Sequence, residues 1–192
     1  SNAVAGLGKA ELRKQIRQSR STRTAQELAQ VNRALATHNW DTLLKGSVIA
    51  CYCAMENEPG TDLLIEELKN LGLSVFLPII SNNGSLQWGL ATTNMVTNEF
   101  GIAEPTNPIQ PTPEFSSVIM PAMAVGRDGS RLGRGGGYYD RWLETLPTSA
   151  EHGPLRIAVV FDNEVLQTLP VEKHDQRIDV IVTPDHIVYI ND

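Results

Sequence analysis

The chain has 192 residues, 41% of them hydrophobic and 20% charged, which suits one globular domain with a sizeable core. Its net charge of −6 and its pI of about 5.2 argue against general nucleic-acid binding, which needs a basic surface. We find no apolar run long enough to span a membrane and no signal-peptide or lipidation pattern, so we expect a cytoplasmic protein without a membrane partner. Ser1-Asn2-Ala3 resembles the remnant of a removed purification tag, and residues 1–192 otherwise predict a single domain.

The first part of the chain predicts two amphipathic helices. In residues 9–20, Leu12 and Ile16 lie one helical turn apart and form an apolar stripe. The basic residues outside this stripe predict a solvated face: Lys9, Arg13, Lys14, Arg17 and Arg20. The capping box Thr24-Ala25-Gln26-Glu27 starts a second helix, whose apolar stripe ends near His38.

The next elements are a strand, a loop and a helix. Residues 47–53 predict a strand in which Cys51 and Cys53 point to the same side, and we expect both to be buried, reduced thiols. The loop 56–60, Glu-Asn-Glu-Pro-Gly, ends this strand. A helix then begins at Thr61 or Asp62 and ends at Gly72, with an inward face of Leu64, Leu68 and Leu71.

The middle of the chain predicts a strand, a hairpin and a long connection. The strand covers residues 73–77 and stops at Pro78, which completes a strand–helix–strand order typical of a parallel sheet. Asn83-Gly84 between two apolar runs predicts a β-hairpin. Residues 91–113 contain four prolines and predict an irregular surface connection, with a lid as a second interpretation.

The last part of the chain alternates strands and helices again. The predicted strands cover residues 118–120, 156–161, 179–182 and 187–190, and the predicted helices cover residues 138–146 and 163–169. The whole pattern predicts an α/β fold, a three-layer α/β/α sandwich with a mostly parallel sheet. In such sheets ligands bind at the carboxyl ends of the strands, where we expect the loops 56–60, 121–137 and Phe161-Asp162.

A glycine-rich loop in residues 131–141 is the strongest candidate for a binding site. Four glycines lie there among three arginines, two tyrosines and an aspartate. Glycines let the backbone approach a ligand closely, and arginines add bidentate donors for phosphate or carboxylate. On an acidic protein, this local positive charge favours the capture of a small phosphorylated ligand.

Two common phosphate-binding motifs do not fit this loop. A P-loop is excluded because no Gly-Lys-Ser/Thr follows the glycines. A dinucleotide fingerprint fits poorly because Tyr138 occupies the third glycine position, although Asp162 could imitate the ribose-binding carboxylate. A tight turn with exposed arginines remains as the structural alternative.

Several motifs in chain order resemble those of the 5-formyltetrahydrofolate cyclo-ligase (methenyltetrahydrofolate synthetase) family. The loop Arg131-Leu132-Gly133-x-Gly135-x-Gly137-Tyr138-Tyr139-Asp140 is similar to the long signature of this family. The further matches are Lys9-x-x-Leu12-Arg13, Met55-x-x-Glu58-x-x-Thr61 and Pro170-Val171 with Asp175 and Asp179. The resemblance covers nearly the whole chain and implies ATP-dependent closure of 5-formyltetrahydrofolate to 5,10-methenyltetrahydrofolate, with release of ADP and phosphate.

The resemblance also implies roles for individual residues. ATP would be bound by Lys9, Arg13, Arg131, Leu132, Gly133, Arg134, Gly135, Gly136, Gly137, Tyr138 and Tyr139. Arg134 would be catalytic, stabilising the phosphoryl group in transfer, and Asp140 and Asp175 would bind Mg²⁺ through hard oxygen ligands. The reduced folate would contact Met55, Glu58, Phe100 and Tyr138, and we expect the enzyme to act as a monomer.

The sequence departs from the family pattern just upstream of the loop. Many members have Phe-Asp where this chain has Val125-Gly126, and Asp128 is a candidate substitute for the missing carboxylate. Gly136 lies where some members carry lysine. These changes leave open a paralogue with a different substrate. The alternatives are a sugar-phosphate isomerase or acyl-CoA-binding protein on a related scaffold, and a non-enzymatic module that binds RNA or an acidic partner.

Overall fold

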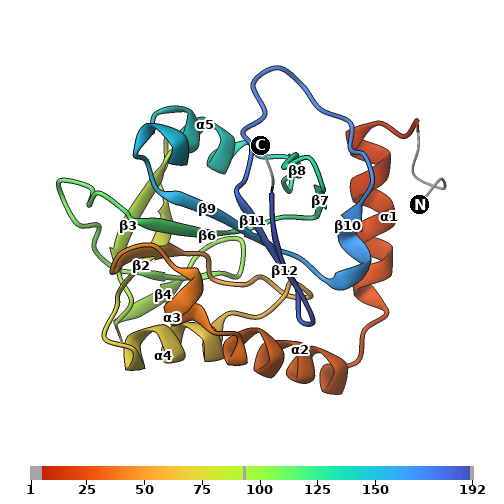
Figure 1. Ribbon diagram of the computed structural model, residues 1–192. Helices are drawn as coiled ribbons and strands as arrows, with labels where there is room; N and C mark the ends of the chain where they lie inside the picture. Colours follow the sequence, from red (N-terminus) through yellow and green to blue (C-terminus); the bar gives the residue numbers. More distant parts are fainter. Residues whose placement is uncertain (1–5, 93, 191–192) are drawn as a thin grey trace.

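The computed structural model describes residues 6–92 and 94–190 and is built around a seven-stranded sheet (Figure 1). The order across the sheet is β12 (Ile187–Tyr189), β11 (Val180–Val182), β9 (Leu155–Val159), β6 (Ser117–Pro121), β1 (Val48–Cys51), β2 (Ser74–Ile80) and β3 (Leu86–Leu90). The inner strands are parallel, and the edge strands β3 and β12 run antiparallel to their neighbours. The predicted mostly parallel sheet is therefore confirmed, while the tag-like Ser1-Asn2-Ala3 lies outside the described residues.

Helices cover both faces of this sheet. In Figure 1, α2 (Ala25–Thr37), α3 (Trp40–Leu43) and α4 (Asp62–Asn70) lie below it, and α5 (Tyr138–Glu144) lies above it. The predicted capping box is present, since the Thr24 hydroxyl accepts from the Glu27 N–H and the Glu27 carboxylate accepts from the Thr24 N–H. The short helix α3 was not predicted. No helix in the described part of the chain is long and apolar enough to cross a membrane.

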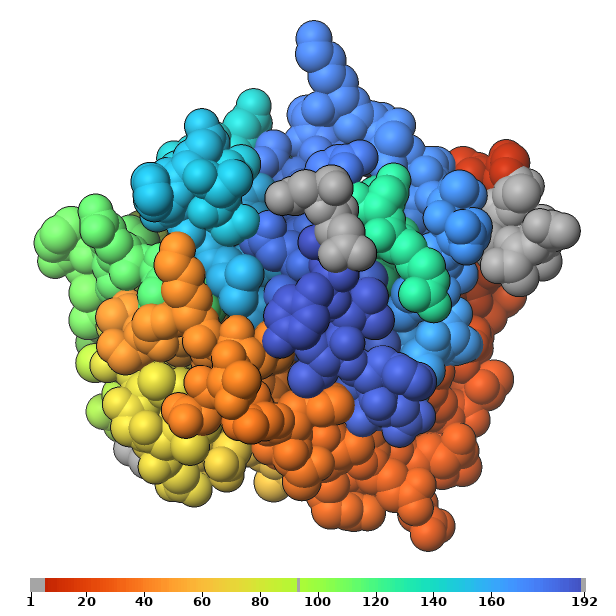
Figure 2. Space-filling model, in the orientation of Figure 1, coloured from red at the N-terminus to blue at the C-terminus, as the bar shows by residue number. Residues whose placement is uncertain are grey.

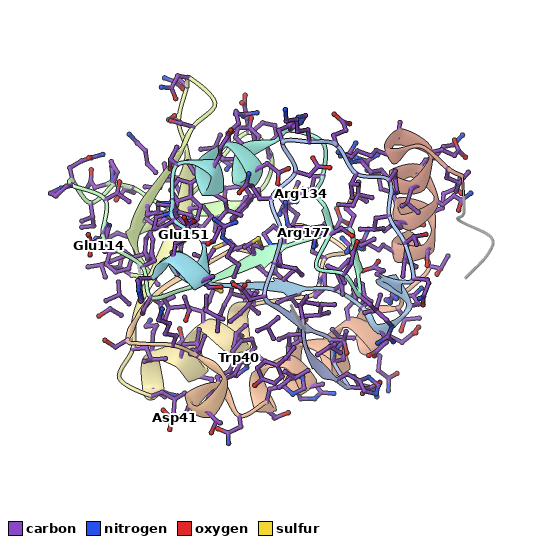
Figure 3. All side chains as sticks on the ribbon, turned by 45° about the horizontal axis from the view of Figure 1, so that its top comes forward. Trp40, Asp41, Glu114, Arg134, Glu151 and Arg177 are labelled. Atoms are coloured by element: carbon purple, nitrogen blue, oxygen red, sulfur yellow. The ribbon has the colours of Figure 1, made fainter. Side chains whose placement is uncertain are left out.

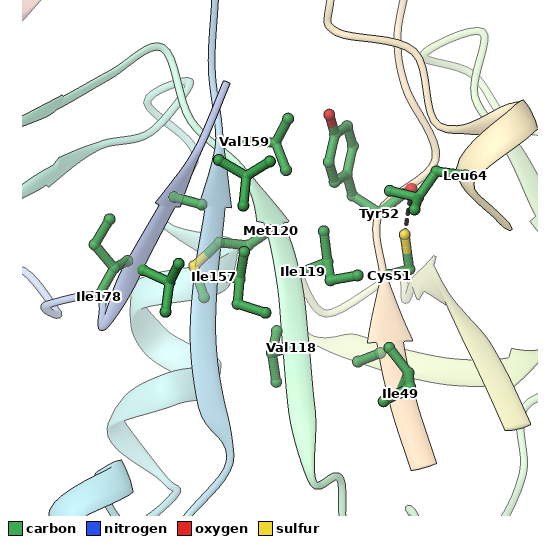
Figure 4. Close-up of a cluster of buried hydrophobic side chains, with 14 of the residues drawn as sticks. Ile49, Cys51, Tyr52, Leu64, Val118, Ile119, Met120, Ile157, Val159 and Ile178 are labelled. Atoms are coloured by element: carbon green, nitrogen blue, oxygen red, sulfur yellow. Dashed lines mark hydrogen bonds between the residues drawn. The ribbon is translucent and has the colours of Figure 1, made fainter. Parts of the chain in front are cut away.

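The core lies on the inner strands (Figure 4). Val118, Ile119 and Ile157 are fully buried, as expected for strands that carry helices on both sides and have continuous apolar sequences. Both cysteines are free thiols, and burial raises the pKa of each. Cys51 is fully buried as predicted, whereas Cys53 lies beyond the end of β1 and is only half-buried.

A small second sheet stands beside the large one and was not predicted. Its strands are β10 (Val165–Leu166), β7 (Ala124–Gly126) and β8 (Arg131–Leu132), and α1 (Lys9–Ser21) packs on it. Leu12, Ile16 and Leu132 belong to the apolar cluster between them. The helix predicted over residues 163–169 is wrong: a 3₁₀ turn at Asp162–Glu164 leads directly into β10. This packing places α1 against the glycine-rich loop, which begins in β8.

The prediction of a solvated face on α1 is wrong for Arg20. Its side chain is buried and donates to both oxygens of Glu164 at 2.8 Å and to the Ala122 carbonyl at 2.8 Å. Burial lowers the pKa of Arg20, but the hydrogen bonds and charge of Glu164 outweigh it, so the pKa lies above its usual value. Charged side chains are buried this way when every donor finds a partner.

Three boundaries also differ from the prediction. Strand β2 continues through Pro78, because this residue lies beyond the last register pair with β1, Ala50–Phe76, and its missing N–H removes no bond between the two strands. Leu71 follows the last residue of α4 and is exposed rather than inward. The connection 91–113 contains a second hairpin, β4 (Met95–Thr97) and β5 (Ala103–Pro105), and β5 packs on β2 and β3.

Candidate active site

A cavity of about 380 Å³ lies at the carboxyl ends of β1, β2 and β6, between α1 and α5. The glycine-rich loop supplies much of its wall, with further residues from α1, from β5 and from the segment after β10. The loop 56–60 reaches the site through Glu58, which bonds to Arg134 of the wall. The predicted contribution of Phe161-Asp162 is wrong, because Asp162 accepts from Thr183 at 2.5 Å and does not line the cavity.

The backbone of the glycine-rich loop adopts conformations that require glycine. Gly135 has φ of 116° and Gly137 has φ of 73°, both in the left-handed region that side chains disfavour. Gly137 is also the residue that immediately precedes α5. These two turns bend the chain sharply from β8 into α5 and leave the backbone of residues 133–137 lining the cavity.

Helix α1 holds the loop from one side. Arg13 Nε donates to the Gly133 carbonyl at 2.8 Å, and Arg17 donates to the Arg134 carbonyl at 3.2 Å. Lys9 and Arg13 both line the cavity. Two residues of the basic face of α1 therefore contact the loop, and the helix brings cationic groups from the start of the chain to the site.

The segment between β10 and β11, residues 167–179, closes the site from above. It arches over the top of Figure 1 and protrudes at the top of Figure 2. Lys9 Nζ donates to Asp175 at 2.6 Å and lies 3.3 Å from Glu172, although Lys9 and Asp175 are 166 residues apart. Burial raises the pKa of Asp175, but hydrogen bonds from Lys9 and from the Glu172 N–H outweigh it, so the pKa lies below its ordinary value.

Arg131 forms the buried floor of the site. Its Nε and Nη2 donate to the Pro121 carbonyl at 2.9 and 2.6 Å, and its Nη1 lies 3.9 Å from Asp140. Burial lowers its pKa, and the Asp140 carboxylate opposes this effect. With two donor groups fixed on Pro121, Arg131 mainly braces β8 against β6, and Nη1 is left as the group nearest to Asp140.

Arg134, the predicted catalytic residue, forms a bidentate pair with Glu58. Arg134 Nε and Nη2 donate to the two Glu58 oxygens at 2.9 and 2.8 Å, and Glu58 also accepts from the Met55 N–H at 2.6 Å. The Glu58 side chain is 6% exposed and the Arg134 side chain 33%. Figure 3 shows Arg134 between α5 and α1. Within the described residues Nη1 of Arg134 makes no hydrogen bond and remains for an anion in the cavity, whereas Nε becomes available only when this pair opens.

Two predicted metal ligands, Asp140 and Asp175, line the same cavity. Asp140 accepts from the Gln176 N–H at 3.2 Å, and Asp175 is held by Lys9. Within residues 6–92 and 94–190, no group of three or more His, Cys, Asp and Glu side chains is assembled for a metal. Two hard carboxylates suit Mg²⁺ if water and phosphate oxygens complete its coordination.

The opposite end of the cavity is largely apolar. Its wall consists of Cys53, Pro78, Ile80, Leu86 and Ile102, with the rings of Tyr138 and Tyr139 nearby. Glu104 and Asn98 also line the cavity, and Glu104 accepts from the Ile80 N–H and from Asn98. Glu104 and Asn98 were not predicted as site residues, because residues 91–113 carry no strand signal that would place them on the sheet.

Four of the predicted ligand-binding residues do not line this cavity: Leu132, Met55, Glu58 and Phe100. The Leu132 side chain is buried under α1, so only its backbone could face a ligand. Met55 supplies its N–H to Glu58. Phe100 is 48% exposed and lines a smaller cavity of about 180 Å³, which shares Ile80, Asn98 and Tyr138 with the main one.

The structure gives a physical reason for Gly126. A Cβ at this position would overlap the Ser130 hydroxyl and lie 2.6 Å from Asp128 Oδ1. Asp128 is turned into this β7–β8 turn, where it accepts from the Ser130 N–H at 3.0 Å. It does not line the cavity, so the suggestion that Asp128 replaces a missing site carboxylate is wrong.

Comparisons with known proteins agree on one family. Residues 6–184 match the model of the 5-formyltetrahydrofolate cyclo-ligase family. The chain is 36% identical over 187 residues to the 5-formyltetrahydrofolate cyclo-ligase of Mycolicibacterium smegmatis, covering 92% of this chain and 93% of the relative. It is 28% identical over 181 residues to that of Escherichia coli K12, covering 90% and 98%. The solved structure of Aquifex aeolicus 5,10-methenyltetrahydrofolate synthetase is similar, with a TM-score of 0.79 and 25% identity over 96% and 93% of the two chains.

Proposed function

The chain belongs to the 5-formyltetrahydrofolate cyclo-ligase family, and we propose that it closes 5-formyltetrahydrofolate to 5,10-methenyltetrahydrofolate in a reaction that uses ATP and Mg²⁺. The observation that carries this proposal is the division of one cavity into two chemically different ends. One end gathers Lys9, Arg13 and Arg134 with three carboxylates, and the other end is largely apolar. A polyphosphate with a divalent cation suits the first end, and a flat heterocycle suits the second.

ATP would supply a phosphoryl group to the formyl oxygen, which then leaves as phosphate when the neighbouring folate nitrogen attacks the formyl carbon. The protein's part is to hold both reactants in line and to neutralise charge. Lys9 and Arg13 lie on the wall at the basic end and would bind phosphate oxygens. Arg134 would turn from Glu58 toward the transferring group and stabilise its developing charge.

The backbone of residues 133–137 would wrap the phosphates, because its glycines leave no side chains in the way. Asp140 and Asp175 would bind Mg²⁺ at this end through their carboxylate oxygens. The Lys9 ammonium donates to the Asp175 carboxylate in this structure. Binding of the metal by Asp175 and of phosphate by Lys9 would therefore break this contact. Arg131 would contribute through Nη1 only, since Pro121 holds its other donors.

The reduced folate would lie against Tyr138 at the apolar end. Once Arg134 turns toward phosphate, the Glu58 carboxylate loses its cation and becomes an acceptor for a folate N–H. Phe100 lies on the adjoining smaller cavity, where it would contact parts of the ligand that extend beyond the main one. Met55 would act through its N–H on Glu58 rather than by direct contact.

The test is direct. The purified chain is incubated with 5-formyltetrahydrofolate and MgATP, and the near-ultraviolet absorbance of the methenyl product is followed. We expect product only when both reactants and Mg²⁺ are present, with one ADP formed per folate consumed. No product, together with no calorimetric binding of folate or ATP, would refute the proposal; binding of a sugar phosphate alone would favour the isomerase alternative. Sedimentation analysis tests the expected monomer.

A further inference from the structure

Four carboxylates line the main cavity: Glu104, Asp140, Glu172 and Asp175. Three of them have a cationic neighbour, since Glu172 and Asp175 pair with Lys9 and Asp140 lies 3.9 Å from Arg131. Among the described residues, Glu104 has no Lys or Arg within ion-pair distance. Glu104 also lies at the apolar end of the cavity, whereas the arginines lie at the basic end. A carboxylate in an apolar wall without a cation is costly unless hydrogen-bond donors reach it.

The Glu104 side chain is held in one orientation. Its Oε2 accepts from the Ile80 N–H at 3.3 Å and from Asn98 Nδ2 at 3.0 Å. Asn98 is fixed in turn, because its Oδ1 accepts from the N–H groups of Phe100 and Ile102. For Oε1, no hydrogen bond is found within residues 6–92 and 94–190. The β4–β5 hairpin thus presents one carboxylate oxygen to the cavity from a rigid support.

Glu58, the other carboxylate near the site, is less available. Both of its oxygens accept from Arg134, and Oε1 also accepts from the Met55 N–H. Glu58 does not line the cavity and its charge is already paired with Arg134, whereas a ligand meets Oε1 of Glu104 without displacing any contact seen in the structure. A ring bound between Ile80, Leu86 and Ile102 would have Glu104 beside it in the cavity wall.

We propose that Glu104 is the specificity-determining residue that binds the aminopyrimidine edge of the reduced folate. This proposal rests on the proposed function and deepens it. The 2-amino group and the adjacent ring N–H of a reduced pterin are parallel donors, the pattern that a carboxylate accepts best. Asn98 is the positioning residue that sets the angle of this carboxylate, and the basic end of the cavity remains for the phosphates.

The replacement Glu104→Gln tests the polarity of this contact. The Ile80 and Asn98 donors would hold the amide oxygen where Oε2 now lies, so the amide NH₂ would face the ligand's own donors. We expect the Kd for 5-formyltetrahydrofolate, measured by calorimetry, to rise about 10- to 100-fold, as for loss of a charged hydrogen bond. The Kd for MgATP should not change. An unchanged folate Kd, or equal weakening of both ligands, would overturn the proposal.

Glu114→Gln is the matched control, because it removes the same charge from a side chain outside the cavity (Figure 3). It should leave both dissociation constants unchanged, and a folate effect equal to that of Glu104→Gln would show that net charge, not position, matters. Glu104→Asp keeps the carboxylate but withdraws it, so its folate Kd should lie between those of wild type and Glu104→Gln. An Asp variant weaker than Gln contradicts the assignment.

A change in the ligand gives a second test that needs no variant. A folate analogue without the 2-amino group should bind wild type about 10- to 100-fold more weakly, and Glu104→Gln should lose this preference because its amide NH₂ faces the 2-amino group. Equal binding of the two ligands by wild type refutes the role of Glu104. This experiment measures binding alone, so it separates the Glu104 proposal from the cyclo-ligase proposal. If wild type forms the methenyl product but binds both ligands equally, the cyclo-ligase function stands and only the Glu104 contact is wrong.

Discussion

Replacing Arg134 by alanine separates the catalytic contribution of this residue from its structural contribution. A single preorganised donor to a transition-state charge typically contributes about 100- to 1,000-fold in kcat, and we expect a loss of this size. For stability, breaking a buried ion pair costs about 3–5 kcal/mol, while an exposed pair contributes about 0–1 kcal/mol. The Arg134–Glu58 pair lies between these limits, since Arg134 is 33% exposed and Glu58 6%.

We therefore expect Arg134→Ala to lower the free energy of unfolding by about 1–2 kcal/mol, which corresponds to a fall in Tm of about 2–8 °C for a chain of this size. Much of this cost comes from leaving the Glu58 carboxylate without a cation, although the Met55 N–H still donates to it. Adding Glu58→Gln removes that charge. The double variant should thus recover most of the lost Tm and none of the lost kcat.

The assay compares thermal unfolding and kcat, at saturating folate and MgATP, for wild type, both single variants and the double variant. If the double variant recovers Tm relative to Arg134→Ala, but its kcat stays below that of Glu58→Gln alone, Arg134 is catalytic. If kcat returns together with Tm, the arginine acts only by holding the loop 56–60 in place, and the proposed stabilisation of the phosphoryl group is wrong. A variant Arg134→Ala with wild-type kcat would refute the reasoning at once.

Three further predictions follow from other contacts. Asp175→Asn should raise the Mg²⁺ concentration for half-maximal activity about tenfold or more, measured by Mg²⁺ titration. The pKa of Asp175 is depressed in the folded protein, so its stabilising effect is present above the unfolded pKa and is lost as pH falls through the folded pKa. The unfolding free energies of wild type and Asp175→Asn should therefore converge as pH falls below about 4. Gly126→Asp, which introduces the residue that many family members carry, should lower Tm, because its Cβ would displace the Ser130 hydroxyl and the Asp128 carboxylate; an unchanged Tm in thermal unfolding would contradict this. Glu164→Met should cost about 3–5 kcal/mol in denaturant unfolding by leaving Arg20 buried and unpaired, while the double variant with Arg20→Met should be more stable than either single one.

Much of the fold follows from local features of the sequence. Val118-Ile119-Met120 predicts a buried parallel strand because an apolar run without alternation fits only a sheet that is covered on both faces. The Thr24–Glu27 capping box predicts the start of α2 because both bonds form within one turn of the chain. The two-residue strands β8 and β10 escape prediction because they exist only through their partners.

The same division holds for the candidate site. The glycines and arginines of residues 131–141 indicate a phosphate-binding loop through their types and spacing alone, and the positive φ of Gly135 and Gly137 agrees with that interpretation. The pairings that define the site join distant segments: Glu58 lies 76 residues from Arg134, and Lys9 lies 166 residues from Asp175. Periodicity and turn chemistry carry no information on contacts between residues so far apart in the sequence.

Composition, periodicity and motif spacing by themselves determined the class of fold, the position of the binding loop and the family resemblance, because each depends on residues near one another in the chain. Only the tertiary structure decided which charges pair with one another. It buried Arg20 against Glu164 and paired Arg134 with Glu58, and it left Glu104 lining the cavity with no cation from residues 6–92 and 94–190 within ion-pair distance. These outcomes depend on burial and on donor geometry, which arise when helices and strands from both ends of the chain pack around one sheet.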